Sequence, residues 1–212
     1  MGEKLEVYDL DSELIGIEDR KEFYANIKKE FKKTGKITKK VKRAVLLLMN
    51  AKGKIVLQKR NLSKNENPGL YDKTIGGHVE EGDSYELTLI KECSEELGFP
   101  VSVLSEEDFS RALRKTDLRI IGLFKEIDYQ SNFLSTRISQ NNKQFIQPYM
   151  QTTYIGYYNG PMQFIDGESS GIEMFHLDEL KKEIKDNPKK FTEDLKFMIK
   201  EYEKFLVPIK QD

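Results

Sequence analysis

One stretch of 24 residues, GGHVEEGDSYELTLIKECSEELGF at positions 76–99, constrains the fold of this chain more than any other. Its two leading glycines are expected to form a turn that leads into a short helix. Asp83 is a candidate N-cap, and Glu86 three residues later completes a capping-box pattern. Gly98 stands where a left-handed C-cap is expected, so the predicted helix spans about residues 84–97.

Three carboxylates share one face of this predicted helix. At about 100° per residue, Glu92, Glu95 and Glu96 fall within one arc of roughly 100°. Such a cluster either lies in solvent or holds a hard divalent cation, which turns the mutual repulsion into coordination. The glycines at 76 and 77 let the backbone approach such a cation without a Cβ in the way. Taken alone, the helix leaves both interpretations open.

The spacing of these residues resembles the Nudix box. That pattern is Gly, five residues, Glu, seven residues, Arg-Glu, an aliphatic residue, any residue, Glu-Glu, any residue, Gly and an aliphatic residue. Counting from Gly77, the chain has matching or related residues at Asp83, Lys91, Glu92, Cys93, Glu95, Glu96, Gly98 and Phe99. Lys91 replaces an Arg that in the family helps to hold the glutamates, and Asp83 replaces a Glu. Lysine lacks the bidentate fork of arginine, so the support is expected to be looser, with Glu95 as a partner at i+4.

The resemblance implies a fold, a cofactor and a set of site residues. The implied fold is of the α/β (α+β) class, with a mixed β-sheet sandwiched between helices. The implied ligands of Mg²⁺, or of Mn²⁺, are Gly76, Gly77, Glu92, Glu95 and Glu96. The implied catalytic residues are Glu92, Glu95 and Glu168, with Glu92 and Glu168 as the candidates for the general base. Contacts to the substrate are expected from Arg60, Lys73 and His78.

The activity that the resemblance implies is hydrolysis of a small-molecule diphosphate, X–diphosphate–Y, by water activated at Mg²⁺. The wider stretch KRNLSKNENPGLYDKTIGGHVEEGD resembles a narrower branch, the isopentenyl-diphosphate isomerases and their relatives. Those enzymes protonate a double bond with a cysteine at the position of Gly76, which has no side chain to donate a proton. A hydrolase is therefore favoured. An isomerase-like enzyme and a non-catalytic diphosphate- or nucleotide-binding module are the alternatives.

Length and charge bound the organisation of the chain and its partners. The 212 residues fit one domain with additions: an N-terminal hairpin and basic helix at 1–42 and a Nudix domain at 43–212. A loop inserted at about 129–149 is expected to contact the substrate or to form a homodimer surface. Nine of the sixteen residues at 28–43 are basic, which fits either a site for RNA or a solvated helix end. We favour the solvated helix end because aromatic residues for base stacking are scarce there.

The single cysteine and the short apolar runs bear on the cellular compartment in which the protein is expected. One cysteine excludes an internal disulfide framework, and Cys93 lies on the apolar side of the predicted helix, where we expect it to pack in the core. The longest apolar run, AVLLLM at 44–49, is too short to cross a bilayer. The first residues have no signal-peptide character. We therefore expect a soluble cytoplasmic protein without membrane contact.

Local signals place several further elements. Two short strands are predicted within residues 5–17, followed by a helix capped by Asp19 and closed by Gly35. Residues 43–60 are typical of a hairpin whose first strand is buried on both faces. Thr192 is a candidate cap of a C-terminal helix with an apolar stripe.

Overall fold

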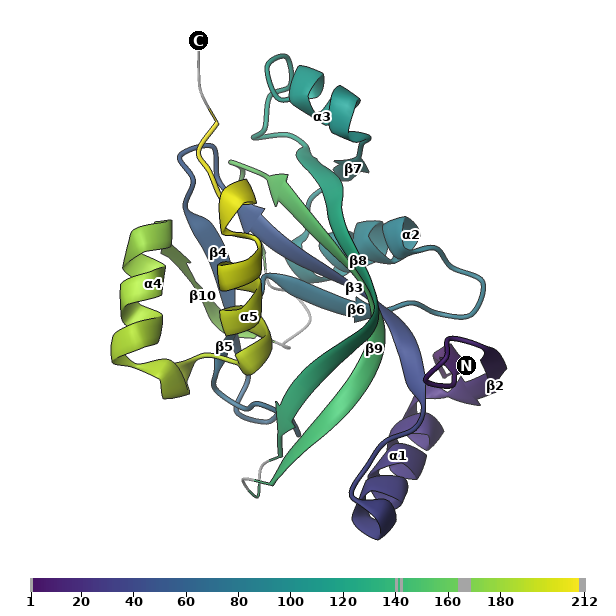
Figure 1. Ribbon diagram of the computed structural model, residues 1–212. Helices are drawn as coiled ribbons and strands as arrows, with labels where there is room; N and C mark the ends of the chain where they lie inside the picture. The colour runs from purple at the N-terminus through teal and green to yellow at the C-terminus, as the bar shows by residue number, and fades with distance from the viewer. Residues whose placement is uncertain (1, 140, 142, 164–168, 210–212) are drawn as a thin grey trace.

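A mixed β-sheet with helices on both faces forms the body of the protein (Figure 1). The structure is a computed structural model that describes residues 2–139, 141, 143–163 and 169–209. Helix α2 (Tyr85–Glu92) covers one face of the sheet, and α5 (Glu193–Glu201) covers the other. The predicted α+β fold, with a mixed sheet between helices, is confirmed. Within the described residues, no helix is both long enough and apolar enough to span a membrane.

The sheet divides beside its central strand, β3 (Lys40–Met49). On one edge, β3 pairs in parallel with β9 (Gln144–Tyr157) along most of its length. On the other edge, it pairs in turn with β1 (Lys4–Tyr8), with β6 (Ile75–His78) and, at its end, with β4 (Ile55–Arg60). The turn expected at Gly76 and Gly77 is therefore wrong, because both glycines lie in β6. Among the described residues, β6 pairs with β3 alone, so its second edge is open. An open edge presents unpaired backbone groups to whatever lies beside it.

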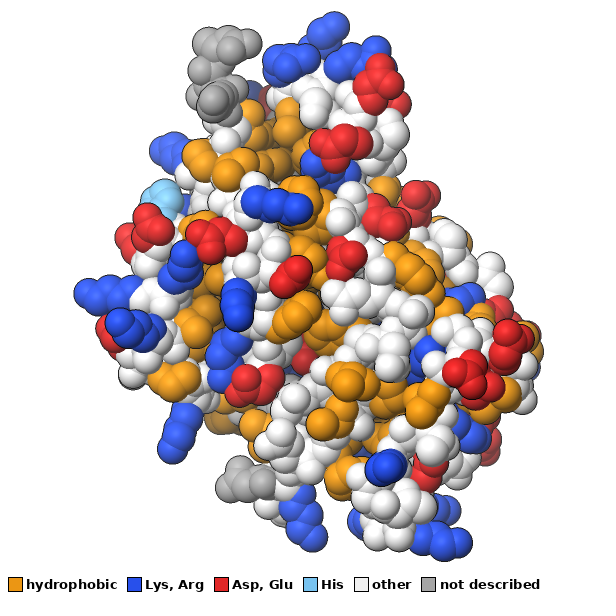
Figure 2. Space-filling model, viewed as in Figure 1, with side chains coloured by type: hydrophobic (Ala, Val, Ile, Leu, Met, Phe, Trp, Pro, Cys, Tyr) orange, Lys and Arg blue, Asp and Glu red, His pale blue; other side chains and the backbone are white. Residues whose placement is uncertain are grey.

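The remaining elements complete the sheet and its covering layers. The strands are β1 (Lys4–Tyr8), β2 (Leu14–Asp19), β5 (Tyr71–Asp72), β7 (Val101–Val103), β8 (Gly122–Ile138) and β10 (Ser169–Phe175). The helices are α1 (Arg20–Thr34), α3 (Glu106–Ala112) and α4 (Leu177–Asp186), with 3₁₀ turns at Pro188–Lys190 and Glu203–Phe205. Acidic and basic side chains intermingle over the visible face of the molecule (Figure 2), in keeping with the balanced total charge.

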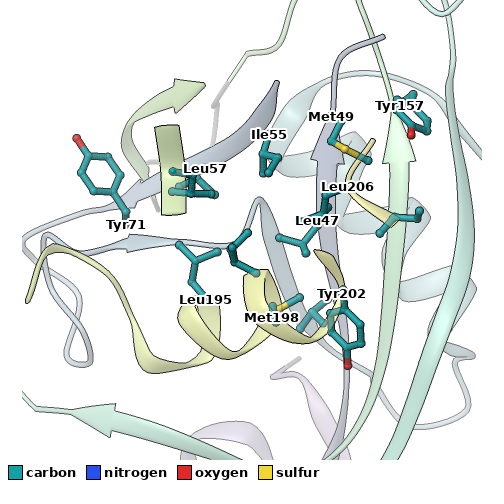
Figure 3. Close-up of a cluster of buried hydrophobic side chains, with 14 of the residues drawn as sticks. Leu47, Met49, Ile55, Leu57, Tyr71, Tyr157, Leu195, Met198, Tyr202 and Leu206 are labelled. Carbon is teal, nitrogen blue, oxygen red and sulfur yellow. The ribbon is translucent and has the colours of Figure 1, made fainter. Parts of the chain in front are cut away.

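The apolar run at 44–49 forms two cores at once, because successive residues of a strand face opposite sides. Its even-numbered residues pack against Leu89 and Cys93 beneath α2, and its odd-numbered residues pack against Leu195 and Met198 of α5 (Figure 3). All six residues are buried, as predicted for this strand, and Cys93 is buried too. Burial of one such side chain stabilises the fold by about 1.5–3 kcal/mol.

The N-terminal segment folds onto the same sheet. Asp19 caps α1 by accepting hydrogen bonds from the backbone, and Gly35 ends the helix with φ at 73°, both as predicted. Strand β1 pairs with the start of β3, and Phe23 of α1 packs in a third core that includes Tyr149 of β9. The boundary near residue 42 therefore lies within a continuous sheet. The division into an extension and a Nudix domain stays a prediction.

The basic segment at 28–43 covers the end of α1 and the start of β3. Three of its lysines form ion pairs, which are Lys28 with Glu66, Lys39 with Glu18 and Lys42 with Glu6. These pairs occupy part of the positive charge that a polyanion would use. Binding of nucleic acid and formation of a homodimer both stay predictions.

The loop predicted at 129–149 is wrong. Most of the described residues in this range belong to a long hairpin in which β8 pairs antiparallel with β9. The inward-facing positions of the hairpin include Ser135, Arg137 and Gln147, all buried. Because polar residues stand where a strand ordinarily has apolar ones, the alternation that indicates a strand was hidden.

The start and the end of the predicted helix at 84–97 also differ from expectation. Ser84 caps it, since its side chain accepts from the Leu87 backbone N–H at 3.0 Å, and the capping box predicted at Asp83 is wrong. Asp83 instead pairs with Lys91 at 2.6 Å, which takes the place of the predicted pairing of Lys91 with Glu95. From Cys93 to Leu97 the helix widens into a π-turn. Turns of this kind occur frequently at functional sites.

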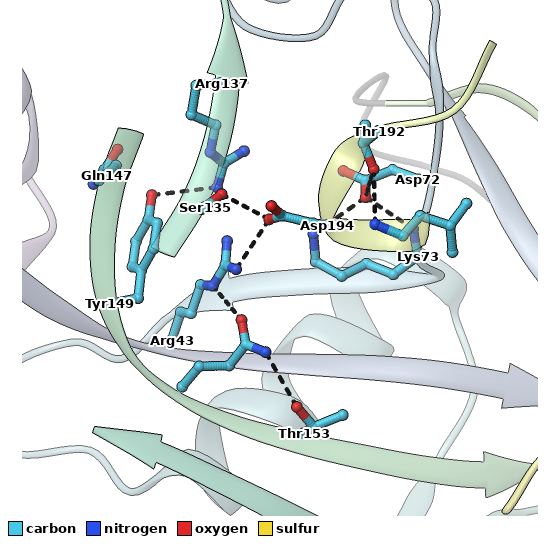
Figure 4. Close-up of polar contacts among 12 residues, drawn as sticks. Arg43, Asp72, Lys73, Ser135, Arg137, Gln147, Tyr149, Thr153, Thr192 and Asp194 are labelled. Carbon is cyan, nitrogen blue, oxygen red and sulfur yellow. Dashed lines mark hydrogen bonds and ion pairs between the residues drawn. The ribbon is translucent and has the colours of Figure 1, made fainter. Parts of the chain in front are cut away.

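A buried charged network joins α5 to the sheet (Figure 4). Arg43 of β3 donates to Asp194 of α5 at 3.0 Å and to Gln151 of β9 at 2.7 Å. Ser135 of β8 donates to the same carboxylate at 2.7 Å. Burial alone would raise the pKa of Asp194, but the positive charges of Arg43 and Lys73 hold that pKa below its ordinary value.

Replacing Asp194 by Asn should lower the free energy of unfolding at pH 7 by about 3–5 kcal/mol, because Arg43 loses its buried counter-charge. The lowered pKa means that this contribution is present above the unfolded value of 3.8 and is lost as pH falls through the folded value. Urea unfolding from neutral to acidic pH should therefore show the two stability curves converging in acid.

The matched control is Asp117→Asn, because Asp117 is exposed and pairs with the exposed Arg119. It should change the free energy of unfolding far less than Asp194→Asn does, because solvent screens an exposed ion pair. A loss for Asp194→Asn that stays constant down to acidic pH would contradict the assigned ion pair.

Candidate active site

Two bare glycines at the open edge of β6 separate groups of opposite charge. A Cβ on Gly77 would overlap the carboxylate of Glu92, and a Cβ on Gly76 would lie 2.8 Å from Cε of Lys73. Gly77 faces the α2 side of the sheet and Gly76 faces the α5 side, because neighbouring strand residues face opposite ways. An acidic and a basic side chain thus occupy the space on either side of one short stretch of backbone. A side chain at either glycine would displace one of these groups, more easily at Gly76, where the displaced group is the flexible end of Lys73.

A narrow cavity of about 40 Å³ opens beside these glycines. Six of the residues predicted from the sequence line it, namely Arg60, Lys73, Gly76, Gly77, His78 and Glu96. Four residues outside that prediction line it as well, namely Arg43, Gln58, Asp72 and Arg137. The structure therefore brings the predicted substrate contacts and the Nudix-box glycines to one place, although their roles stay predictions.

The three helix carboxylates are arranged unequally around this cavity. Glu96 is only 8% exposed and lines the cavity, whereas Glu95 on the same π-turn is exposed to solvent. Glu92, at the end of α2, is partly buried against Gly77. Glu168, the further predicted carboxylate, lies outside the described residues. Within the part of the chain that the structure describes, no three acidic, histidine or cysteine side chains gather closely enough to hold a metal by themselves.

The donor set nevertheless fits Mg²⁺. This cation usually takes one or two carboxylates from the protein and completes its shell with waters and phosphate oxygens. Glu92 and Glu96 supply two carboxylates beside the same glycines, where no Cβ keeps a ligand from the backbone. The arrangement suits a cation that is held jointly by protein and phosphate, rather than a closed all-protein cage.

The opposite wall of the cavity is basic and is organised by one buried carboxylate. Asp72 pairs with Lys73 at 3.3 Å and with Arg60 at 3.5 Å, and it accepts a hydrogen bond from Thr192 at 2.8 Å. Burial alone would raise the pKa of Asp72, but these positive neighbours hold that pKa well below its ordinary value. Asp72 therefore stays ionised and fixes Lys73 and Arg60 at the cavity.

The N-terminal helix contributes to this region through Tyr24. Its hydroxyl lies 2.5 Å from Nε2 of His78 and 3.1 Å from the hydroxyl of Tyr149. Burial, together with nearby cations such as Arg20 and Arg137, holds the pKa of His78 well below its ordinary value. His78 is therefore a neutral ring held by Tyr24, and its predicted contact with the substrate stays a prediction.

Sequence reasoning did not select Arg43, Asp72, Tyr24 or Gln58 as site residues. The position of Arg43 could have indicated a buried site, since a charged residue next to the buried run at 44–49 needs a partner inside the fold. Arg137 lies within the range 129–149 that was predicted as a loop. Tyr24 lies in a helix 54 residues before His78, and no local pattern connects the two.

The chain has a wide match to one family model and local matches to known proteins. The model of the NUDIX domain matches residues 39–195, more than half of the chain. An uncharacterized Nudix hydrolase from Pseudomonas aeruginosa is 41% identical over 61 residues, which cover 29% of this chain and 36% of that protein. The isopentenyl-diphosphate Delta-isomerase of Escherichia coli is 38% identical over 55 residues, which cover 26% of this chain and 30% of the isomerase. These matches span about a third of the length of either relative.

Structural likeness extends further than sequence likeness. The crystal structure of DR0079 from Deinococcus radiodurans superposes with a TM-score of 0.62 at 17% identity, and the superposition covers 93% of this chain and 98% of that one. At this identity the likeness concerns the fold alone. The family match over so much of the chain, together with this shared fold, shows that the protein belongs to the Nudix family.

Proposed function

We propose that this protein is a hydrolase that cleaves the diphosphate linkage of a small molecule with water. The observation that carries the proposal is the meeting of carboxylates and cations at the open, side-chain-free edge of β6. A diphosphate needs positive groups to bind it, and an attacking water needs a base. Family membership supports the same reaction class, because Nudix hydrolases act on diphosphate bonds.

The residues that would hold Mg²⁺, or Mn²⁺, are Glu92, Glu95 and Glu96 with the backbone at Gly76 and Gly77. When bound, the cation supplies charge neutralisation for the phosphates and a lower pKa for the attacking water. Arg60 and Lys73 bind phosphate oxygens from the other side, in the orientation that Asp72 fixes. One phosphate of the substrate would thus lie between the two walls of the cavity.

A carboxylate at this edge accepts the proton of the attacking water. Glu92 is our first candidate, because its carboxylate lies directly against Gly77, where the cavity begins. Glu168 is the second candidate, on the strength of the family pattern alone, and Glu95 completes the proposed catalytic set. General-base catalysis typically contributes about 10²–10⁴-fold to a rate.

Isomerisation is the less favoured function, although the isomerases are among the relatives. Their proton donor would have to stand at Gly76, where Cε of Lys73 already occupies the space above the backbone. A purely binding module is less favoured as well, because the three glutamates of the box are intact.

Replacing Glu92 or Glu96 by Gln should lower kcat for diphosphate hydrolysis by about 10²–10⁴-fold, because the neutral amide neither accepts the proton nor holds a cation. Glu95→Gln should also lower it. The assay is phosphate release across nucleoside, sugar, coenzyme and isoprenoid diphosphates, with Mg²⁺ and with a chelator. Glu107→Gln, on the exposed surface of α3, is the control and should leave kcat unchanged. Full turnover by the Glu96 variant, or turnover unaffected by the chelator, would refute the site.

Replacing Gly77 by Ala should lower kcat/KM by about 100-fold, because the added methyl group pushes the Glu92 carboxylate aside. Gly76→Ala should have a smaller effect, since the group it displaces is the far end of the flexible Lys73 side chain. Gly16→Ala is the control, because nothing lies within 4 Å of the added atom. Kinetics are paired with thermal melts, and equal activity of all three variants would show that the glycine edge is not the reaction site.

A further inference from the structure

Arg137 is a buried cation that forms no ion pair with a carboxylate of the described residues, although the charges of Asp194 and Glu66 act on it from a greater distance. Its side chain lines the cavity, is 8% exposed and donates one hydrogen bond, to the hydroxyl of Tyr149 at 3.2 Å. Its Nε has no hydrogen-bond partner among the described residues. The other cations of the cavity are all paired, Arg43 with Asp194 and both Arg60 and Lys73 with Asp72. A buried charge without an ion pair is costly, so this position suits an anion that completes it.

The basic wall carries two positive charges more than its acids neutralise. Three arginines and one lysine line it, namely Arg43, Arg60, Arg137 and Lys73. The carboxylates paired with them are those of Asp72 and Asp194, whereas Glu96, which also lines the cavity, stands on the side proposed for the cation. Among the described residues of the basic wall, four cations minus two anions leave an excess of two. A terminal phosphoryl group carries about −1.5 to −2 charges at pH 7. A phosphate esterified on both sides carries a single negative charge and would leave the wall undercompensated.

The size of the cavity points to the same group. One water molecule needs about 10–15 Å³ of such space, so a cavity of 40 Å³ accepts a group of roughly three or four heavy atoms. A phosphoryl group is of that size, whereas a nucleobase or a sugar ring is much larger. The ring of Tyr149 supports two cations of the basic wall. Its centroid lies 4.1 Å from the guanidinium carbon of Arg43, and its hydroxyl accepts a hydrogen bond from Arg137.

We propose that Arg137, together with Lys73, binds the terminal phosphoryl group of the substrate, which is therefore a diphosphate monoester and not a diphosphate flanked on both sides. The inference rests on the proposed function and specifies its substrate class. In the reaction, the water oxygen bonds to one phosphorus and the bridging phosphorus–oxygen bond breaks. The products are a phosphate monoester and inorganic phosphate, and the proton of the water passes to the carboxylate base.

The test compares ADP with ADP-ribose, which differ in whether the second phosphate is free or esterified. For the wild type with Mg²⁺, kcat/KM should be at least tenfold higher for ADP. Arg137→Met should lower the value for ADP by about 30-fold, mainly through KM, and should abolish the preference. Arg137→Lys should recover part of the loss. Arg119→Met, a matched change at an exposed arginine, should alter neither value.

A second measurement, of thermal melting with and without the non-hydrolysable methylenediphosphonate, separates binding from folding and from turnover. Arg137→Met should melt close to the wild-type temperature, because Asp194 and Glu66 act on the Arg137 charge without forming an ion pair with it, and it should lose the stabilisation that the ligand gives the wild type. If neither nucleotide is hydrolysed but this difference in stabilisation is seen, the proposed function fails and the anion site stands.

Two results would overturn the inference. One is a wild type that cleaves ADP-ribose as well as ADP. The other is an Arg137→Met variant that melts lower than the wild type and responds fully to methylenediphosphonate, since Arg137 would then serve the fold alone.

Discussion

The separation of opposite charges by the bare backbone of Gly76 and Gly77 is the constraint on which the site depends. Strand β6 is paired on one edge, and its two glycines leave room for Glu92 on one side and Lys73 on the other. At close range these side chains would neutralise each other and bind nothing. Because the two side chains lie on opposite faces of β6, a polyanion and a cation can be held together at the open edge of this strand.

The rest of the fold keeps this arrangement rigid. The sheet divides beside β3, which frees the edge of β6, and α2 with its terminal π-turn brings the glutamates to that edge. On the basic side, Asp72 pairs with Lys73, and Asp194 pairs with Arg43. Thr192 at the start of α5 donates a hydrogen bond to Asp72. A charged network inside a protein is stable only when its members are paired, which is why the unpaired Nε of Arg137 stands out.

The sequence predicted those parts of the fold whose signals are local. The cap at Asp19, the glycine end of α1 and the doubly buried strand at 44–49 follow from neighbouring residues, and all three are confirmed. The part of the β8–β9 hairpin at 129–149 could not be predicted, because its inward residues Ser135, Arg137 and Gln147 are polar. Ser84 and Asp83 are both good caps, and only the tertiary pairing of Asp83 with Lys91 selects between them. The contact of Tyr24 with His78 depends on the path of the whole chain.

The most direct test of the account is a crystal structure of the protein with Mn²⁺ and methylenediphosphonate, with the metal located by its anomalous signal. The account predicts Mn²⁺ beside Glu92 and Glu96, one phosphonate group on that metal, and the other within hydrogen-bond distance of Arg137 and Lys73. A metal and a ligand bound away from the Gly76–Gly77 edge, with Glu92 and Glu96 directed into solvent, would contradict it.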